Sequence, residues 1–374
     1  MGRQIAGGRG RAWQACGAFA FAADGKISAA GQVLAQPPRA VLEPWPFFLT
    51  TLVFLIKIML PDLSIIIVTY NSLADIVKCL ESLEKFCIGV NLEIIVFDNA
   101  STDDTPNLVA SAFPKVRLLR YDENVGFARA NNLAAAQGRG RYLLLLNPDT
   151  WVDDDLAAAL VKFLDAHPKA SALAPRVLTP EGKVQYSSVC ALPTLALLFY
   201  EQIGLSQLFP RSRRFGRYRM TYWNHNEIRE VEHATGACLA IRREVYDELA
   251  GFDENFFMYI EDLDLSYRLM NHGKKIFYLP SAHVFHAGGQ SGNQMAIQNY
   301  LELYRSFYRY FRKHHHRGKV IVAKLILTLG LLLRVIALAF ASLAESFMRS
   351  HPYWKSRRQQ LAGHARLLLQ HWSY

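Results

Sequence analysis

Three short polar segments follow three predicted β-strands, each at the point where its strand ends. They carry hydroxyl, amide or carboxylate side chains: Thr69 and Asn71 after the first strand, the run Asp98–Asp103 after the second, and Asn147 and Asp149 after a later one. A carboxylate at such a position could simply cap the next helix. Because ligands of open α/β sheets bind beyond the carboxyl ends of the strands, three such segments favour one shared crevice instead.

Phosphate binding in this crevice would depend on a metal ion. No GxGxxG or P-loop motif follows these strands, so backbone amides are not expected to cradle a phosphate. A bound diphosphate would then need a cation, and a hard oxygen ligand such as Asp149 suits magnesium or manganese. His286, which stands before a Gly-rich run, is a second ligand candidate, although a lone histidine is more often structural.

Three carboxylates, Glu261, Asp262 and Asp264, stand at the start of a predicted amphipathic helix. Like charges this close repel, so some of them must be paired or must bind a ligand. One alternative is purely structural: Asp262 caps the helix, and Asp264 pairs with Arg268 four residues later.

The elements that must position these residues alternate between strand and helix. The predicted strands are 63–69, 92–97, 116–121, 142–146 and a short one at 275–279; the predicted helices are 73–85, near 105–112, 129–138 and 153–166. The strands are rich in β-branched and apolar residues, as in sheets that are buried on both faces. This alternation predicts an α/β fold with an open, mostly parallel sheet flanked by helices.

Composition excludes several classes of protein. About half of the 374 residues are hydrophobic and a fifth are charged, which excludes a wholly disordered chain. No run of 18 apolar residues is free of charge, which argues against a polytopic membrane protein. The five cysteines have no CxxC spacing, which excludes a thiolate zinc cluster and favours a reducing compartment.

The two ends of the chain differ from the middle. Residues 1–58 are a leader of doubtful function, and Met59 is the expected natural start. From Asn299 onward there are 13 Lys and Arg against two Glu, which accounts for the whole net charge of +10. We expect residues 292–374 to form basic amphipathic helices that associate with an anionic membrane surface. A single polar arc from Lys313 to Arg349 would face the headgroups, and a spanning helix would place Arg334 near the bilayer centre.

The motifs, taken in order, resemble the family-two inverting glycosyltransferases, and most closely their bacterial rhamnosyltransferase-like branch. The resemblance covers about residues 59–291 and is carried by seven segments: 64–71, 98–103, 124–132, 146–149, 235–237, 261–264 and His286. It implies a GT-A fold, a nucleotide-diphosphate sugar donor and a divalent metal, Mg²⁺ or Mn²⁺.

The resemblance also implies residue roles. Asp262 would be the catalytic base, and Asp149 and His286 would bind the metal. The donor would be bound by ten residues: Thr69, Asn71, Asp98, Asn124, Gly126, Asn131, Asn147, Gly236, Ala237 and Glu261. Asn147 departs from the common pattern, which has Asp there, so metal affinity should be lower. Asn-Pro-Asp is nonetheless usual in the rhamnosyltransferase-like branch, which favours deoxythymidine-diphosphate rhamnose as the donor.

The function expected from these features is an inverting glycosyltransferase. It would move a sugar to a hydroxyl of a lipid-linked or cell-envelope glycan, as a peripheral protein on the cytoplasmic face of the inner membrane. One alternative is a non-catalytic nucleotide-sugar or carbohydrate-binding module on the same fold. A second is a nucleic-acid-binding protein, suggested by the basic tail; the apolar stripe in that tail and the lack of a recognition motif argue against nucleic acid as a partner.

Overall fold

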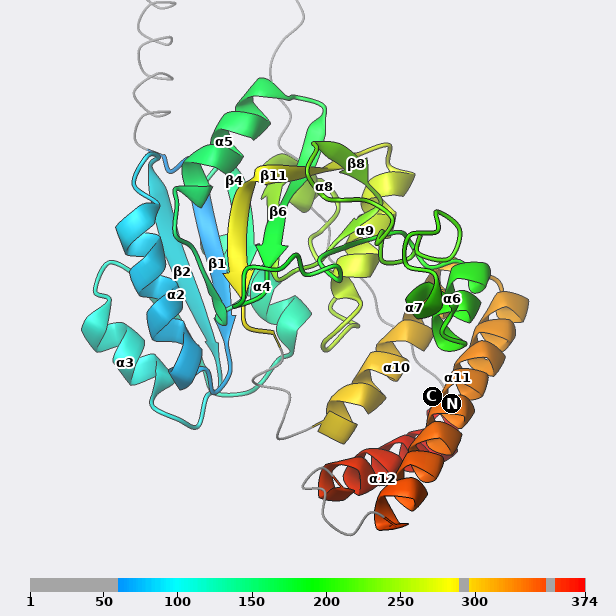
Figure 1. Ribbon diagram of the computed structural model, residues 1–374. Helices are drawn as coiled ribbons and strands as arrows, with labels where there is room; N and C mark the ends of the chain where they lie inside the picture. The colour runs from blue at the N-terminus through cyan, green and yellow to red at the C-terminus, as the bar shows by residue number, and fades with distance from the viewer. Residues whose placement is uncertain (1–59, 289–295, 348–353, 374) are drawn as a thin grey trace, which may run out of the picture. The chain divides into compact units, whose positions relative to one another are not determined.

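The computed structural model describes residues 60–288, 296–347 and 354–373 (Figure 1). The expected leader and Met59 lie outside the described residues. Nine strands form one mixed sheet in the order β3-β2-β1-β4-β10-β6-β11-β5, and β8 pairs with β11. Two further strands, β7 and β9, pair with each other.

The strands have the following bounds: β1 Leu63–Thr69, β2 Leu92–Asn99, β3 Arg117–Tyr121, β4 Tyr142–Leu146, β5 Thr150–Trp151, β6 Ala170–Leu178, β7 Val189–Cys190, β8 Arg229–Val231, β9 His233–Ala234, β10 Cys238–Arg242 and β11 Lys275–His286. The helices are α2 Leu73–Phe86, α3 Thr105–Ala112, α4 Phe127–Gln137, α5 Leu156–Ala166, α6 Leu195–Gln202, α7 Leu205–Leu208, α8 Arg243–Glu248, α9 Glu261–Asn271, α10 Ala296–His314, α11 Arg317–Phe347 and α12 Trp354–Gln370.

The predicted open, mostly parallel sheet is confirmed. Strands β1, β2, β3 and β4 are parallel, and β6 and β11 run in the same direction. Strand β10 is inserted antiparallel between β4 and β6, and β5 and β8 are antiparallel to β11. The carboxyl ends of the parallel strands therefore meet at one edge of the sheet, as the crevice requires.

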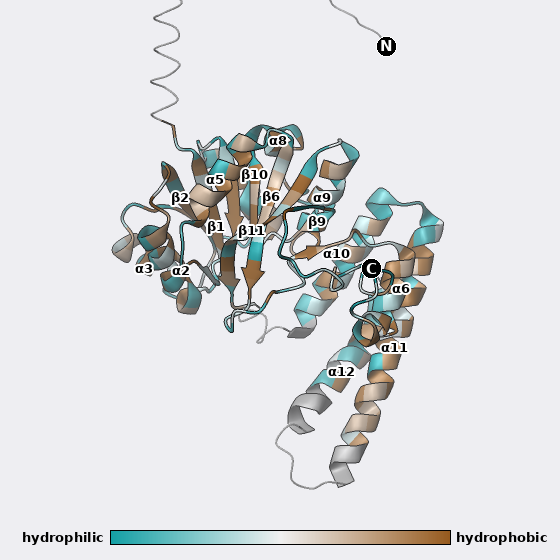
Figure 2. Ribbon diagram, turned by 45° about the horizontal axis from the view of Figure 1, so that its top comes forward, coloured by the Kyte–Doolittle hydropathy of each residue, from teal (hydrophilic) through white to brown (hydrophobic). Residues whose placement is uncertain are grey.

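Hydrophobic side chains of β1 point alternately to two cores. Leu63, Ile65 and Ile67 pack in a core with helices α2, α3 and α5, whereas Ile66 and Val68 pack in a core with α4, α8 and α9. This period-two alternation is the reason that a continuous apolar run forms a strand covered on both faces. In Figure 2 the central strands are accordingly brown, and helices lie on both faces of the sheet.

Two predicted elements differ from the structure. The short strand predicted at 275–279 continues to His286, because a register shift after Leu279 lets β11 resume pairing with β6 beyond Pro280. The helix predicted from residue 153 begins at Leu156, because the Asp155 side chain accepts a hydrogen bond from Ala158 N (2.9 Å) and caps it.

The single polar arc predicted for the tail is wrong. The helical conformation is interrupted at residues 315–316, so Lys313 belongs to α10 and not to the long helix α11. Lys313 Nζ contacts Asp264 Oδ1 (2.7 Å) on α9. Within α11, Lys324 Nζ donates to Trp372 O (3.3 Å), and Thr328 contacts His371. Lys313 therefore faces the sheet domain, whereas Lys324 and Thr328 face the last residues of the tail.

The opposite face of α11 is exposed and apolar. It carries Ile321, Val322, Leu325, Leu329, Leu332, Leu333, Ile336, Phe340 and Leu343. Residues 317–343 are long and apolar enough to cross a membrane by length and composition. The amphipathic character predicted for the tail is thus present, with Lys324 on the packed side and Arg317 and Lys319 exposed in the first turn of α11.

Candidate active site

Strands β1 and β2 bring two predicted donor-binding residues together. Thr69 Oγ1 donates a hydrogen bond to Asp98 Oδ1 (3.2 Å), and Asp98 Oδ2 accepts one from Ser101 N (3.2 Å). Both Thr69 and Asp98 are buried. The register of the two parallel strands sets this contact, because Thr69 and Asp98 are paired positions.

Asn71 connects the loops after these two strands. Its Oδ1 accepts hydrogen bonds from Thr102 N (2.7 Å) and Asp103 N (3.3 Å), and its own N–H donates to Ser101 Oγ (2.9 Å). The residue has a positive φ of 51°, which Asn tolerates better than most residues. The first two polar segments therefore form one hydrogen-bonded unit.

The segment before α4 is fixed from two sides. Asn124 Oδ1 accepts hydrogen bonds from Asn99 Nδ2 (2.9 Å) and Gly126 N (3.0 Å). Gly126 has φ of +84°, and a Cβ there would lie 2.5 Å from Phe257 O, so only glycine fits. Asn131 is buried and donates to Phe127 O of its own helix (2.9 Å).

The turn at Gly236 and Ala237 links the end of β4 to the start of α9. Ala237 O accepts a hydrogen bond from Asn147 N (3.0 Å), and Gly236 N donates to Asp262 Oδ2 (2.9 Å). Four residues from three separate predicted motifs thus lie side by side at the crevice.

The backbone is strained just before helix α9, which carries the three neighbouring carboxylates. Tyr259 and Ile260 both have φ of +68°, a conformation that is costly for residues with large side chains, by about 1–3 kcal/mol each. The strained turn aims the first turn of α9 at the Gly236 turn. There Asp262 is partly exposed, and its Oδ1 accepts a hydrogen bond from Leu263 N (2.8 Å).

Asp149 and His286 meet at the carboxyl end of the sheet. Asp149 Oδ1 lies 3.2 Å from His286 Nε2, and Asn147 Nδ2 lies 3.5 Å from the same nitrogen. The other ring nitrogen, Nδ1, lies 2.9 Å from Gln185 Oε1. A hydrogen bond donated by Nδ1 to Gln185 would leave the Nε2 lone pair free to bind a metal ion shared with Asp149.

Comparison with known proteins decides the family. The sequence profile described as glycosyl transferase family 2 matches residues 64–250. The chain belongs to glycosyl transferase family 2. The matched segment runs from β1 through α8 and includes most of the crevice described above.

Relatives include rhamnosyltransferases. The chain is 31% identical over 250 residues to the N-acetylglucosaminyl-diphospho-decaprenol L-rhamnosyltransferase of Mycobacterium tuberculosis, which covers 62% of this chain and 80% of that protein. It is 23% identical over 196 residues to the rhamnosyltransferase WbbL of Escherichia coli, covering 50% and 70%. Among solved structures, the mannosyltransferase PcManGT of Pyrobaculum calidifontis matches with a TM-score of 0.49 and 20% identity, covering 87% and 94%. The predicted membership of a family of nucleotide-sugar glycosyltransferases with a rhamnosyltransferase-like branch is confirmed.

In this glycosyltransferase, the neighbouring carboxylates differ sharply. Asp264 is fully buried, and it pairs with Arg268 (2.7 Å), Lys313 (2.7 Å) and His314 (2.7 Å), which hold its pKa down to about 2 against the effect of burial. The structural alternative for Asp264, an ion pair with Arg268 four residues later, is therefore confirmed. Glu261 is also buried, and burial, followed by the charge of Asp262, raises its pKa well above the usual range. Its Oε2 has no hydrogen-bond partner among the described residues.

The raised pKa of Glu261 predicts a pH-dependent stability. The folded state holds this proton where the unfolded chain releases it, so the contribution of Glu261 to stability is lost as pH rises through the folded pKa. We expect Glu261→Gln to gain stability relative to the parent between about pH 5 and pH 8, by about 1.4 kcal/mol for each unit by which the pKa is raised. Urea unfolding at both pH values measures the difference. A difference in unfolding free energy between variant and parent that does not change with pH would contradict the raised pKa of Glu261.

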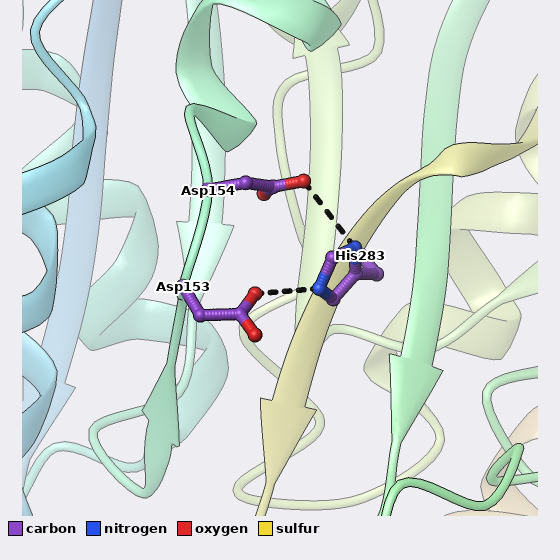
Figure 3. Close-up of side chains that lie close together, drawn as sticks. All are labelled: Asp153, Asp154 and His283. Atoms are coloured by element: carbon purple, nitrogen blue, oxygen red, sulfur yellow. Dashed lines mark hydrogen bonds and ion pairs between the residues drawn. The ribbon is translucent and has the colours of Figure 1, made fainter.

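A second histidine cluster lies beside the site. His283 on β11 contacts Asp153 Oδ1 through Nε2 (2.6 Å) and Asp154 Oδ2 through Nδ1 (3.4 Å) (Figure 3). These side chains are close enough to be considered as a metal site. A single ion would take one nitrogen of His283 and one oxygen of each carboxylate, and these three atoms lie within 4.8 Å of one another. The geometry is that of a histidine bridging two carboxylates.

Sequence reasoning missed two residues that hold the site. Asn99 donates to Asn124 and accepts from Val125 N (2.9 Å), and Gln185 contacts His286. Asn99 follows Asp98 directly, so its place at a strand end was a usable signal. Gln185 lies between strands, 101 residues before His286, and no local pattern connects the two.

Proposed function

We propose that the chain is an inverting glycosyltransferase that uses Asp262 as its catalytic base. The observation that carries the proposal is the convergence of Asp262, the Gly236 turn and the Asp149–His286 pair at one edge of the sheet. The positive end of α9 favours a negative charge at Asp262. Two backbone N–H groups, those of Gly236 and Leu263, fix the orientation of its carboxylate.

The proposed reaction is a single in-line displacement. Asp262 takes the proton of an acceptor hydroxyl as that oxygen attacks the anomeric carbon of the sugar from the face opposite the diphosphate. One displacement by one nucleophile inverts the anomeric configuration. The proposed donor-binding residues are the ten that the family resemblance implies: Thr69, Asn71, Asp98, Asn124, Gly126, Asn131, Asn147, Gly236, Ala237 and Glu261.

The residues at the end of β4 fit a divalent cation, Mg²⁺ or Mn²⁺. Asn147 Oδ1 is buried and has no hydrogen-bond partner among the described residues. It stands two residues from Asp149, whose carboxylate lies beside the Nε2 lone pair of His286. Two hard oxygens and an imidazole are a donor set that Mg²⁺ or Mn²⁺ accepts. The negative charge that builds on the leaving diphosphate would be offset by the cation held there.

The proposed donor is deoxythymidine-diphosphate rhamnose, and the proposed acceptor is a lipid-linked or other cell-envelope glycan. The Mycobacterium tuberculosis relative is named for transfer of L-rhamnose to a decaprenol-linked acceptor, which supports rhamnose as the sugar and a lipid-linked acceptor. A panel of nucleotide sugars tests them: the purified protein should hydrolyse the rhamnose donor faster than the others, and only with a divalent cation. A non-catalytic binding module would hydrolyse none of the donors.

The exposed face of α11 supports a peripheral position on a membrane, proposed here as the cytoplasmic face of the inner membrane. Its apolar side chains point away from the rest of the tail, and Lys324 and Thr328 face the last turn of the chain. A helix lying in the plane of the interface would bury this apolar face and keep Arg334, which lies by Tyr304, on the side of the enzyme.

We expect a triple variant, Leu325→Ser, Leu332→Ser and Ile336→Ser, to bind vesicles about 100-fold more weakly, since each side chain contributes about 1 kcal/mol or more on burial. Vesicle flotation measures the partition. The matched control replaces three exposed apolar residues of the sheet domain, Ile88, Ile228 and Met270, by Ser, and should float like the parent. Resistance of the parent to alkaline carbonate extraction would mean that α11 spans the bilayer instead.

A further inference from the structure

Helix α7 ends in an exposed apolar tip. Leu208, its last residue, has 70% of its surface exposed, and the next residue, Phe209, has 51%. Phe199 on α6 is also exposed. Single exposed apolar side chains need no explanation, but a group of them rimmed by polar residues marks an interaction site.

Three exposed arginines follow the apolar residues directly: Arg211, Arg213 and Arg214. Within the described part of the chain, none of the three forms an ion pair. The Arg214 Nε donates to Tyr200 Oη (3.1 Å), and the guanidinium lies 5.6 Å from the Phe215 ring. Phe209 and Phe215 pack 5.7 Å apart. We call this group the α7 tip: Phe199, Tyr200, Leu208, Phe209, Arg211, Arg213, Arg214 and Phe215.

The α7 tip is anchored to helix α6, which packs on the long apolar helix α11. Helix α6 packs on α11, and Gly330 is the point of closest approach, since a Cβ there would lie 2.1 Å from Gln202 Oε1. In Figures 1 and 2 helices α6 and α11 lie side by side, and Figure 1 shows α7 next to α6. Ser206 Oγ of α7 also donates to the buried Glu201 of α6 (2.5 Å). The tip is therefore connected to α11 through α6.

From Ile321 to Leu343 the exposed face of α11 is apolar, and Lys324 contacts Trp372 on the packed side; the exposed cations Arg317 and Lys319 lie in the first turn of the helix. An apolar face alone binds neutral and anionic lipid alike. The arginines of the α7 tip add positive charge away from that first turn, next to apolar and aromatic groups of the kind that enter a membrane interface.

We propose that the α7 tip is a second membrane contact, in which Leu208 and Phe209 enter the interface and Arg211, Arg213 and Arg214 bind the phosphates of anionic lipid. The proposal rests on the membrane association in the proposed function and adds its lipid selectivity. The chain runs from the tip to Tyr218, whose carbonyl accepts a hydrogen bond from Ala191 N (2.9 Å) and so connects the tip to the sheet domain. Ala191 follows β7, and β7 pairs with β9 just before the Gly236 turn.

The test compares two charge-reversal variants of the full chain. The tip variant is Arg211→Glu, Arg213→Glu and Arg214→Glu; the matched control is Lys115→Glu, Lys162→Glu and Lys169→Glu, three exposed lysines of the sheet domain. Both lower the net charge equally. Partition is measured with vesicles of phosphatidylcholine alone and of phosphatidylcholine mixed with phosphatidylglycerol, with donor hydrolysis as the check of folding.

The parent should prefer the anionic vesicles, and the tip variant should lose about 100-fold of its affinity for them while the control keeps it. Leu208→Ser with Phe209→Ser should weaken binding to both kinds of vesicle. Equal loss in the tip and control variants, or no loss in either, overturns the proposal. Loss of heparin binding with vesicle binding intact would point to a soluble polyanion and also overturns it. A parent that binds no vesicle would instead refute the membrane association itself.

Discussion

Asp262→Asn should lower turnover by about 10²- to 10⁴-fold while donor binding changes little. The amide cannot take the proton of the acceptor hydroxyl, so the reaction loses its proposed base. Asp262 also accepts hydrogen bonds from two backbone N–H groups, those of Gly236 and Leu263, through different oxygens. The single oxygen of Asn satisfies only one of them, so stability should fall by about 1 kcal/mol.

Three measurements separate these effects. Calorimetry should give a donor affinity close to that of the parent, and urea unfolding should give the small loss of stability. Glu244→Gln, which places a neutral amide in the first turn of α8 at an exposed position outside the site, is the control and should retain the turnover. Asp262→Asn with turnover within about threefold of the parent would remove Asp262 from its role and make Glu261 the next candidate.

The sheet could be predicted from sequence because each strand carries its own signal. The bounds of β1 and β4 agree residue by residue with the predicted strands, since continuous apolar runs between polar loops leave little choice. Strand β11 was predicted too short because Pro280 normally ends a strand. Its continuation depends on a register shift against β6, which is a tertiary contact with no local signature.

The candidate site could be predicted where its residues follow strands that have a local sequence signal, and not where it depends on tertiary contacts. Polar residues at strand ends must meet at one edge of a parallel sheet, so the neighbourhood of Asp98 and Asp149 followed from topology. The contact between Gly236 and Asp262 did not, because it joins a turn to a strained helix start. Periodicity also locates the apolar face of α11, but it does not show what the polar face packs against. It therefore predicts that Lys324 faces lipid headgroups, whereas Lys324 contacts Trp372 in the structure.

Asp149→Ala should abolish cation-dependent donor binding and lower the manganese affinity by more than about 100-fold. Replacing a residue that only orients a metal ligand typically lowers metal affinity about 10- to 100-fold, and the loss of a ligand itself should exceed that. Asp149 is the proposed anionic ligand at the end of β4; its neighbour Asn147 offers a neutral oxygen. His286→Ala should weaken binding less, because the carboxylate remains. Asn147→Asp should strengthen it, since a charged oxygen replaces a neutral one.

Gln185→Leu distinguishes a metal site from a simple ion pair between Asp149 and His286. Leucine keeps the approximate volume but removes the oxygen 2.9 Å from His286 Nδ1, so the imidazole is no longer held with its Nε2 lone pair toward Asp149. Manganese affinity should fall about tenfold, as for other residues that orient a metal ligand. Titration with manganese alone, followed by calorimetry, measures this without any turnover. Donor binding that is indifferent to chelator and to Asp149→Ala would mean that the site works without a metal, and the Asp149–His286 contact would then be structural.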